Sequence, residues 1–274
     1  MMYFRMLRLE VATNRKRLLL LFSISVGIAL VMCVSFYSWY YKKALVEDRF
    51  IPSFWDQLVY FYRGIPPFTP SWQESFEMPI AYLIMNLVLL FALGNTTASV
   101  FEPYGYEIFT RIPKRSVWWL AHCLMAVIAA IVEQTAIIGT ITVFCLAVGG
   151  PFAICDYRGL AIPELVSWPG TGYMQVLSLL LSPVLAAIAL ALLQLLLELV
   201  AGDTLGLIFA IVFVVSGAFL DEPILFCGHA MMQRLSAFTG DGITMKQTVL
   251  WTGVISALSI IVGARHLSKK DLIR

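Results

Sequence analysis

Six long apolar runs separated by polar segments are the main pattern of this sequence. Crossing the hydrocarbon core of a bilayer takes about 20 apolar residues in a helix, because a helix satisfies its backbone hydrogen bonds within one segment. The pattern therefore predicts an all-α membrane protein, with residues 1–274 forming a single transmembrane domain. We place the six spans at approximately 18–39, 79–100, 117–148, 173–200, 204–220 and 248–264.

The spans differ in length and in composition. The third is longer than a bilayer requires, so we expect it to tilt or to project from the membrane. The fourth contains Pro183, which predicts a kink. The first run follows three basic residues and so resembles a signal peptide, but it is too long and lacks a small-residue cleavage site. We therefore expect it to be retained as the first span.

Composition agrees with this class of protein. Hydrophobic residues make up 60% of the chain and charged residues 13%, whereas a soluble domain carries about 25% charged residues. The net charge of +2 is too small to indicate nucleic-acid binding. The five cysteines show neither a C-x-x-C spacing nor histidines at metal-ligand intervals, so they predict no metal site and no redox pair. Whether Cys155 and Cys227, both in predicted outer loops, form a disulfide stays open.

The basic residues are concentrated on one side of the predicted membrane. Twelve Lys and Arg residues precede the first span, lie in the 101–116 loop or follow the last span, and seven lie in the other loops. Cytoplasmic segments carry the excess of Lys and Arg in membrane proteins. We therefore expect both termini and the 101–116 loop to be cytoplasmic.

The segment before the first span, "MMYFRMLRLEVATNRKR", has an apolar stripe at helical spacing with basic residues beside it. This pattern is typical of a helix that lies in the headgroup layer of the inner leaflet, in contact with membrane lipid. The basic residues of this expected interfacial helix are Arg5, Arg8, Arg15, Lys16 and Arg17. The alternative is a disordered basic leader that only sets the topology.

Two predicted outer segments are rich in apolar residues. Residues 42–78 contain "RFIPSFWDQLVYFYRGIPPFTPSW", which is too aromatic for a disordered linker. We expect this segment to fold on the outer surface or to dip into the membrane interface. Residues 221–246 have a short apolar centre between polar ends, too short to span, and predict a re-entrant or interfacial helix pair.

Polar side chains inside the spans require a partner or a function, because a charge at the bilayer centre costs about 2.5–3.5 kcal/mol on insertion scales. Glu133 lies midway along the third span with Gln134 beside it. Glu133 indicates either the lining of a polar pathway or a proton site. The alternative is a structural hydrogen bond within the bundle, to Asn86 or Gln194. Glu198, near the cytoplasmic end of the fourth span, is expected to snorkel or to contact the inner face.

Gly202 and Gly206 form a G-x-x-x-G spacing at the start of the fifth span. Such a spacing permits close contact between helices in lipid. We expect this face to be a subunit interface.

Motifs of nucleotide binding and of hydrolysis are missing from the sequence. No Walker A sequence, G-x-G-x-x-G, H-E-x-x-H or G-x-S-x-G occurs. We therefore expect no enzymatic activity on this chain, and any energy source must be supplied by a partner.

The 101–116 loop is the most informative segment. Its apolar residues at 108, 109 and 112 recur at helical spacing with charges between them, which predicts a short amphipathic helix closed by Pro113. Such a helix would lie along the inner membrane face. Trp118 and Trp119 are then expected to anchor the next span at the headgroup level. A basic loop that only sets the topology is the alternative.

The basic amphipathic N-terminus, the six spans, the inner loop "GYEIFTRIPKRSVWWLAHCL" and the broken segment before the last span together resemble the permease subunit of a type-two ATP-binding-cassette exporter. The resemblance covers nearly the whole chain in architecture, and its sequence signature is concentrated in residues 104–124. It implies a separate ATPase subunit that docks on a short coupling helix between the second and third spans. The coupling residues that it implies are Tyr106, Glu107, Phe109, Arg111, Lys114 and Arg115.

The resemblance also implies how the protein works and where. Two permeases, either two copies or two paralogues, pair around a pathway, and ATP and magnesium bind to the partner ATPase, so this chain carries no cofactor. Permeases with long aromatic outer loops resemble those that export amphipathic peptides such as cytolysins and bacteriocins from bacteria, or confer immunity to them. The expected function is ATP-driven export of amphipathic peptides or lipid-like molecules across a bacterial plasma membrane.

Two alternatives belong to other functional classes. An ion-coupled secondary carrier would use Glu133 as its ion site and would need no ATPase. A non-transporting immunity or sensor membrane protein would need no pathway at all.

Overall fold

The computed structural model describes residues 2–44, 53–66, 78–96, 115–152, 173–239 and 242–269. Within them the backbone forms helices and turns, and the one β-bridge joins Leu235 to Ile243. The long helices are α2 (Arg15–Ala44), α4 (Ile80–Leu93), α6 (Arg115–Val148), α7 (Tyr173–Ala201), α8 (Asp203–Phe219) and α10 (Met245–Lys269). The short elements are α1 (Met2–Thr13), α3 (Phe54–Tyr62), the 3₁₀ turns η4 (Phe226–Ala230) and η5 (Met232–Arg234), and α9 (Ser236–Thr239). The predicted all-α class is confirmed for these residues.

Four helices are long and apolar enough to cross a bilayer, namely Arg15–Ser38 within α2, α6, Gln175–Ala201 within α7, and α10. The chain is therefore a helical membrane protein. α4 and α8 are also apolar but have 14 and 17 residues. At about 1.5 Å per residue they are about 21 and 26 Å long, which is shorter than a hydrocarbon core of about 30 Å. The six predicted spans thus correspond to four full-length helices and two short ones.

α4 ends at Leu93, whereas the prediction extends the second span to residue 100. Asn95 has a φ of 64°, a left-handed conformation that commonly follows the end of a helix. The Thr96 hydroxyl donates to the carbonyl O of Leu93 at 2.7 Å. Arg17 of α2 donates through Nη1 to the carbonyl O of Gly94 at 3.1 Å. A turn therefore stops the helix, and side chains satisfy the carbonyl groups at its end.

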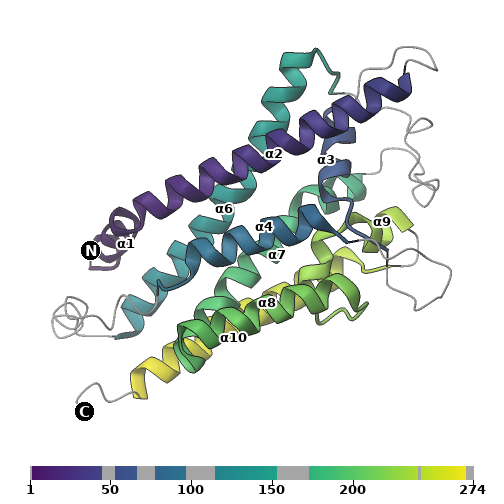
Figure 1. Cartoon of the computed structure of the whole chain (residues 1–274). Coiled ribbons are helices and arrows are strands. Elements are labelled where there is room, and N and C mark those ends of the chain that lie inside the picture. The colour runs from purple at the N-terminus through teal and green to yellow at the C-terminus, as the bar shows by residue number, and fades with distance from the viewer. Residues whose placement is uncertain are drawn as a thin grey trace.

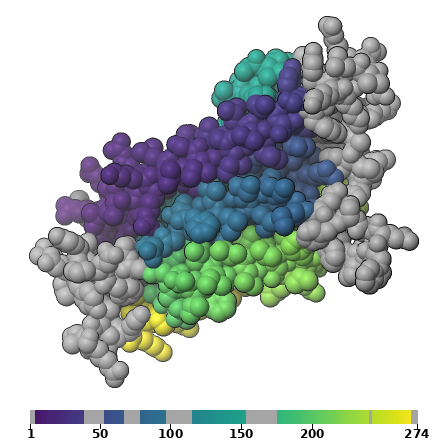
Figure 2. All heavy atoms as spheres, viewed as in Figure 1, coloured from purple at the N-terminus to yellow at the C-terminus, as the bar shows by residue number. Residues whose placement is uncertain are grey.

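The long helices form one bundle with α7 at its centre, since α7 contacts α4, α6, α8 and α10. α1 and the last turns of α10 lie at one end of the bundle, which we call the α1 end (Figure 1). α3 and α9 lie at the opposite end, which we call the α3 end. Figure 2 shows α2, α4 and α8 side by side on one face of the bundle.

Small residues allow α6 and α7 to approach closely. Ala126, Ala129 and Ala130 of α6 share one core cluster with Ala187 and Ala191 of α7. Short side chains bring the two backbones near each other, and the resulting van der Waals contacts drive helix association in lipid. Close packing of small side chains therefore holds α6 against α7.

Trp118 and Trp119 are buried within the bundle, so the expectation that they anchor α6 at the headgroup level is wrong. Their side chains are 2% and 0% exposed. Trp119 packs against Gly263 of α10, where any larger residue would overlap its ring. Its Nε1 donates to the carbonyl O of Ile260 at 3.0 Å. Because both indole N–H groups have acceptors inside the protein, neither needs the membrane interface.

Gly206, in the first turn of α8, packs against the last turn of α7 within the same chain. A Cβ atom at this position would lie 2.5 Å from the backbone N of Glu198 and 2.7 Å from the carbonyl C of Leu197. Gly202, with a φ of 88°, makes the turn itself. The spacing of the two glycines therefore lets α8 fold back directly onto the last turn of α7.

At the α3 end, residues 221–239 form short turns rather than the expected re-entrant or interfacial helix pair. η4 packs against α7, α8 and α10. Gly228 lies so close to α8 that a Cβ atom on it would be 2.8 Å from the carbonyl O of Gly217. The expected folding of the aromatic outer segment is confirmed over α3, which begins with a capping box formed by Ser53 and Asp56.

Arg234 of η5 caps the C-terminus of α8. Its guanidinium donates to the carbonyl O atoms of Gly217 at 3.0 Å, Ala218 at 2.6 Å and Leu220 at 2.8 Å. Nε lies 3.4 Å from the carbonyl O of Ile65, after α3. A cation at this position satisfies carbonyl groups that lack helical partners and interacts favourably with the helix dipole. Arg234 thus joins α8, η5 and the segment after α3 into one unit.

We expect Arg234→Met to destabilise the protein by about 3 kcal/mol, because buried carbonyl groups lose their donor. Methionine retains much of the apolar contact of the arginine side chain, so the loss reports the hydrogen bonds. Unfolding in mixed micelles, followed by circular dichroism, measures it. Lys246→Met, which removes an exposed cation at the same end, is the control and should unfold like the parent protein. Equal stability of the two variants would show that Arg234 does not hold this end together.

Candidate functional site

The segment expected to couple to an ATPase lies mostly outside the described residues. Arg115 is described, begins α6 and is half-buried. The other coupling residues expected from the sequence, which lie outside the described ranges, are Tyr106, Glu107, Phe109, Arg111 and Lys114. The described elements that flank this segment are the last turn of α4 and the first turns of α6, and α1 contacts α6 beside them.

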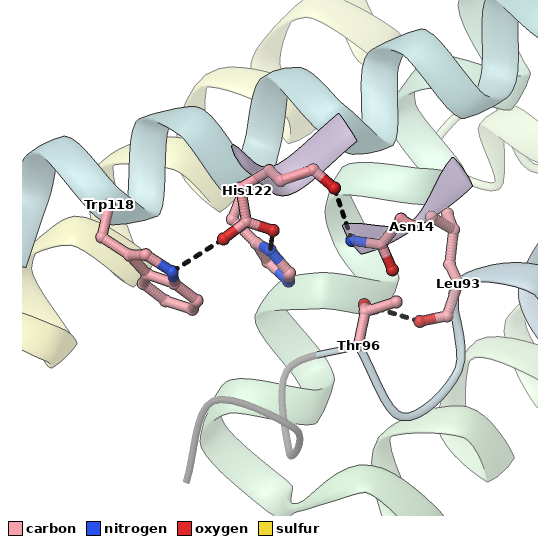
Figure 3. Close-up of polar contacts among 6 residues, drawn as sticks. Asn14, Leu93, Thr96, Trp118 and His122 are labelled. Atoms are coloured by element: carbon pink, nitrogen blue, oxygen red, sulfur yellow. Dashed lines mark hydrogen bonds and ion pairs between the residues drawn. The ribbon is translucent and has the colours of Figure 1, made fainter. Parts of the chain in front are cut away.

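Glu10 of α1 holds the first turns of α6 (Figure 3). Its Oε1 accepts a hydrogen bond from Nε1 of Trp118 at 3.0 Å, and its Oε2 lies 3.4 Å from Nδ1 of His122. The rings of Trp118 and His122 stack with their centroids 4.8 Å apart. The two residues are one helical turn apart, so a single carboxylate reaches both. A polar clamp therefore fixes α1 on α6 in addition to apolar packing.

Asn14 forms the elbow between α1 and α2. Its side chain is buried, and its Nδ2 donates to the carbonyl O of Glu10 at 3.0 Å. Its own carbonyl O accepts from the backbone N of Leu18 at 3.0 Å. Arg17, in the first turn of α2, contacts the end of α4 as described above. Polar contacts thus join α1, α2, α4 and α6 within one small region at the α1 end.

The outward face of α1 combines apolar and basic side chains. Phe4 and Leu9 are 75% and 46% exposed, and Arg5 and Arg8 are exposed beside them. Met6, on the other face, belongs to the same core cluster as Trp118. Residues 2–13 form a helix, as the apolar stripe predicts, and its place in the headgroup layer stays a prediction. Arg15 and Lys16, two other basic residues of the predicted interfacial segment, are also exposed.

The polar residues predicted inside the spans separate into two groups. The first group is Gln194 and Glu198, on successive turns of α7. Nε2 of Gln194 donates to the carbonyl O of Leu90 and to Oε1 of Glu198, both at 2.8 Å. Glu198 is 2% exposed, so it is buried and does not snorkel as expected. This group connects α7 to α4 near the α7–α8 turn and has no hydrogen bond to Glu133 among the described residues.

The second group is Asn86, Glu133 and Gln134, beside Tyr62 of α3. The Tyr62 hydroxyl donates to Oε1 of Gln134 at 2.6 Å, and burial raises the pKa of Tyr62 far above its ordinary value, so the hydroxyl keeps its proton. Nδ2 of Asn86 donates to the carbonyl O of Tyr82 on its own helix at 2.8 Å. Glu133 is 2% exposed, yet its Oε1 has no hydrogen-bond partner in the described part of the chain. The bundle hydrogen bond expected from Asn86 is not formed.

A small pocket lies beside Glu133. Its volume is about 20 Å³, which accommodates one water-sized group. The residues that line it are Phe61, Tyr62, Tyr82, Met85, Asn86, Glu133, Gln134, Pro183, Ala187 and Ala230. The described residues contain no cluster of three or more His, Cys, Asp or Glu that could hold a metal ion. Chemically, the pocket offers a buried carboxyl group surrounded by aromatic rings.

Sequence reasoning missed the role of Glu10 and of its partners on α6. Two signals were available. Glu10 is the one acidic residue before Glu47, and Trp118 and His122 have the spacing of side chains on one helix face. Neither signal shows that α1 packs across α6, because that contact joins residues more than 100 positions apart.

Comparison with known proteins identifies no relative, since no family model, no curated protein and no solved structure matches the chain significantly.

We expect Glu10→Ala to release α1 from α6 and to destabilise the protein by about 2 kcal/mol, because the buried N–H of Trp118 loses its acceptor. Glu10→Gln keeps an acceptor and should lose about half as much. The rate of trypsin cleavage at Arg5 and Arg8 measures the release directly. Glu222→Ala, an exposed acid at the α3 end, is the control. Unchanged cleavage in Glu10→Ala would contradict the clamp.

Proposed function

We propose that this chain is the permease subunit of an ATP-driven exporter in a bacterial plasma membrane. The assembly contains a second permease copy or paralogue and separate ATPase subunits, and it moves amphipathic peptides or lipid-like molecules outward. The observation that supports this most is the junction of α1 with the first turns of α6, next to the basic segment that ends at Arg115.

This junction is suited to transmit a displacement. α6 has 34 residues and a length of about 51 Å, and it contacts α1, α2, α4, α7 and α10. A displacement at Arg115 would therefore act on most of the bundle at once. Rigid-body rotation of packed helices is a common switching motion. Glu10 would make α1 move together with α6 and keep the base of the bundle intact during the motion.

The distribution of charge in the described residues supports a cytosolic α1 end. The exposed cations there are Arg5, Arg8, Arg15 and Lys16 near the N-terminus, with Arg265 and Lys269 in the last turns of α10. Asp221, Glu222 and Lys246 are exposed at the α3 end. An excess of Lys and Arg marks the cytoplasmic side. The ATPase would meet this basic end.

The chain itself performs no covalent chemistry in this proposal and holds no cofactor, because ATP and magnesium bind to the ATPase. The coupling segment comprises Tyr106, Glu107, Phe109, Arg111, Lys114 and Arg115. Its three cations would dock against an acidic groove on the ATPase. The amphipathic face of α1 would rest in the inner headgroup layer beside it.

An ion-coupled carrier is the second candidate. Glu133 is buried beside a pocket, and one of its oxygens has no partner in the part of the chain that the structure describes. Intramembrane carboxyl groups often form ion or proton sites in such carriers. The two candidates differ in what drives them. Purified protein in vesicles would transport without any ATPase if it were a carrier, and would not if it were an exporter permease.

We expect reversal of Arg111, Lys114 and Arg115 to Glu to abolish copurification of the ATPase and to stop export, because the docking charges would then repel an acidic groove. The measurement is affinity purification of the tagged chain from its native host, followed by quantification of the bound ATPase. Reversal of Arg265 and Lys269, which lie at the same end but outside the coupling segment, is the matched control. Undiminished copurification and export in the triple variant would count against the proposal.

A further inference from the structure

The pocket beside Glu133 presents a free acceptor, while the tyrosine hydroxyls that line it are already engaged. Oε1 of Glu133 has no hydrogen-bond partner among the described residues. The hydroxyl of Tyr62 donates to Gln134, and the hydroxyl of Tyr82 donates to the carbonyl O of Val214 at 3.1 Å. A group that enters this pocket must therefore supply donors of its own. An anion is disfavoured because it would face the carboxyl group.

A carboxylate that is 2% exposed must be paired with a cation or give up its charge, because an unpaired buried charge costs several kcal/mol. The wall of the pocket provides a second attraction for a cation. The rings of Phe61, Tyr62 and Tyr82 line the pocket, and aromatic faces attract ammonium groups within about 6 Å of the ring centre. Charge and ring chemistry therefore select the same kind of ligand.

Size restricts the ligand further. A volume of about 20 Å³ holds one water-sized group. A primary ammonium group is of this size and carries three donors and no acceptor. A quaternary ammonium or a guanidinium group is larger than one water-sized group. Of the organic cations, a terminal –NH₃⁺ group therefore matches the volume and the free acceptor.

The pocket is not fully enclosed. Asn86 of α4 and Ala230 of η4 are half-buried, whereas the other lining residues are buried. These two residues therefore mark the accessible side of the pocket.

We propose that this pocket binds the terminal ammonium group of the exported molecule, either a peptide N-terminus or a lysine side chain, with Glu133 as its counter-ion. The inference depends on the proposed function for naming a transported substrate. Binding of an ammonium group to the isolated chain does not depend on it.

The test uses purified protein in lipid nanodiscs, without any ATPase, titrated with methylammonium chloride. Tetramethylammonium chloride at equal ionic strength is the matched probe, because its cation has the same charge but a head group larger than the pocket. We expect methylammonium to raise the midpoint of thermal unfolding in a saturable manner and tetramethylammonium to leave it unchanged. Infrared difference spectra should show that Glu133 carries a carboxylate when methylammonium is bound.

Glu133→Gln should weaken the apparent affinity for methylammonium at least about tenfold, because the charge partner is lost. Ala230→Val narrows the opening and should weaken the affinity for methylammonium to a similar extent, although Glu133 is retained. This variant keeps the test valid if Glu133→Gln does not fold. Glu198→Gln, the other buried glutamate on a long helix, should bind like the parent protein. Each of three results would overturn the proposal. The first is equal stabilisation by methylammonium and tetramethylammonium, and the second is full affinity for methylammonium in Glu133→Gln. The third is a protonated carboxyl band that does not change at saturating methylammonium, which is the result for a pocket that holds only water. Failure of the parent protein to copurify an ATPase from the native host would instead overturn the proposed function and leave this binding result standing.

Discussion

The whole structure depends on one constraint, which is that backbone and side-chain polar groups cannot find partners in lipid and must find them in the protein. The two short helices show this most clearly. The carbonyl group that follows α4 is satisfied by Arg17 from α2, and the last carbonyl groups of α8 are satisfied by Arg234 from η5. In both cases an arginine from a different element supplies the donors. Helices of 14 and 17 residues are thereby built into a bundle whose other members are long enough to cross a bilayer.

The same constraint explains why the polar contacts lie where they do. Trp118 and Trp119 donate to acceptors on α1 and α10, so indoles that could have faced the headgroups connect helices instead. Gln194 connects α7 to the carbonyl O of Leu90 on α4. Glu133 is one of several exceptions. Among the described residues one of its oxygens has no partner, as is also true of Oε1 of Gln194 and Nε2 of His122, but Glu133 is the carboxyl group in this set. A buried carboxyl group without a complete set of partners is costly, and this cost is the physical reason to assign it a ligand.

The α1–α6 junction links the fold to the proposed mechanism. α1 is short, and an isolated helix of 12 residues is marginally stable in water. Glu10 and Met6 give it partners on α6, and Asn14 fixes its angle to α2. A helix held in this way moves with α6, and it brings the basic residues of the N-terminus next to the first turns of α6.

The local pattern of the sequence predicted those parts of the fold that depend on local properties. The apolar runs located α2, α6, α7 and α10, and the stripe before the first run predicted α1. The pattern also located α4 but not the residue where α4 ends, because that end depends on the left-handed turn at Asn95.

Contacts between distant residues could not be predicted in this way. The burial of Trp118, the role of Gly206 within one chain and the clamp at Glu10 depend on which helices meet, and no periodicity encodes that. At the candidate sites, the sequence identified Glu133 and Gln134 but not the hydrogen bond between Gln134 and Tyr62. The coupling segment remains a prediction, since most of it lies outside the described residues.

The central claim is that the α1 end of the bundle faces the cytosol, where an ATPase can reach it. Labelling of single cysteines with a membrane-impermeant maleimide, in a background without the native cysteines, tests this claim most directly. The account predicts that cysteines replacing Glu222 and Lys246 react in intact cells, and that cysteines replacing Arg8 and Ser268 react only after permeabilisation. Reaction at Arg8 or at Ser268 from outside would contradict it, because the basic end would then be out of reach of any cytosolic ATPase.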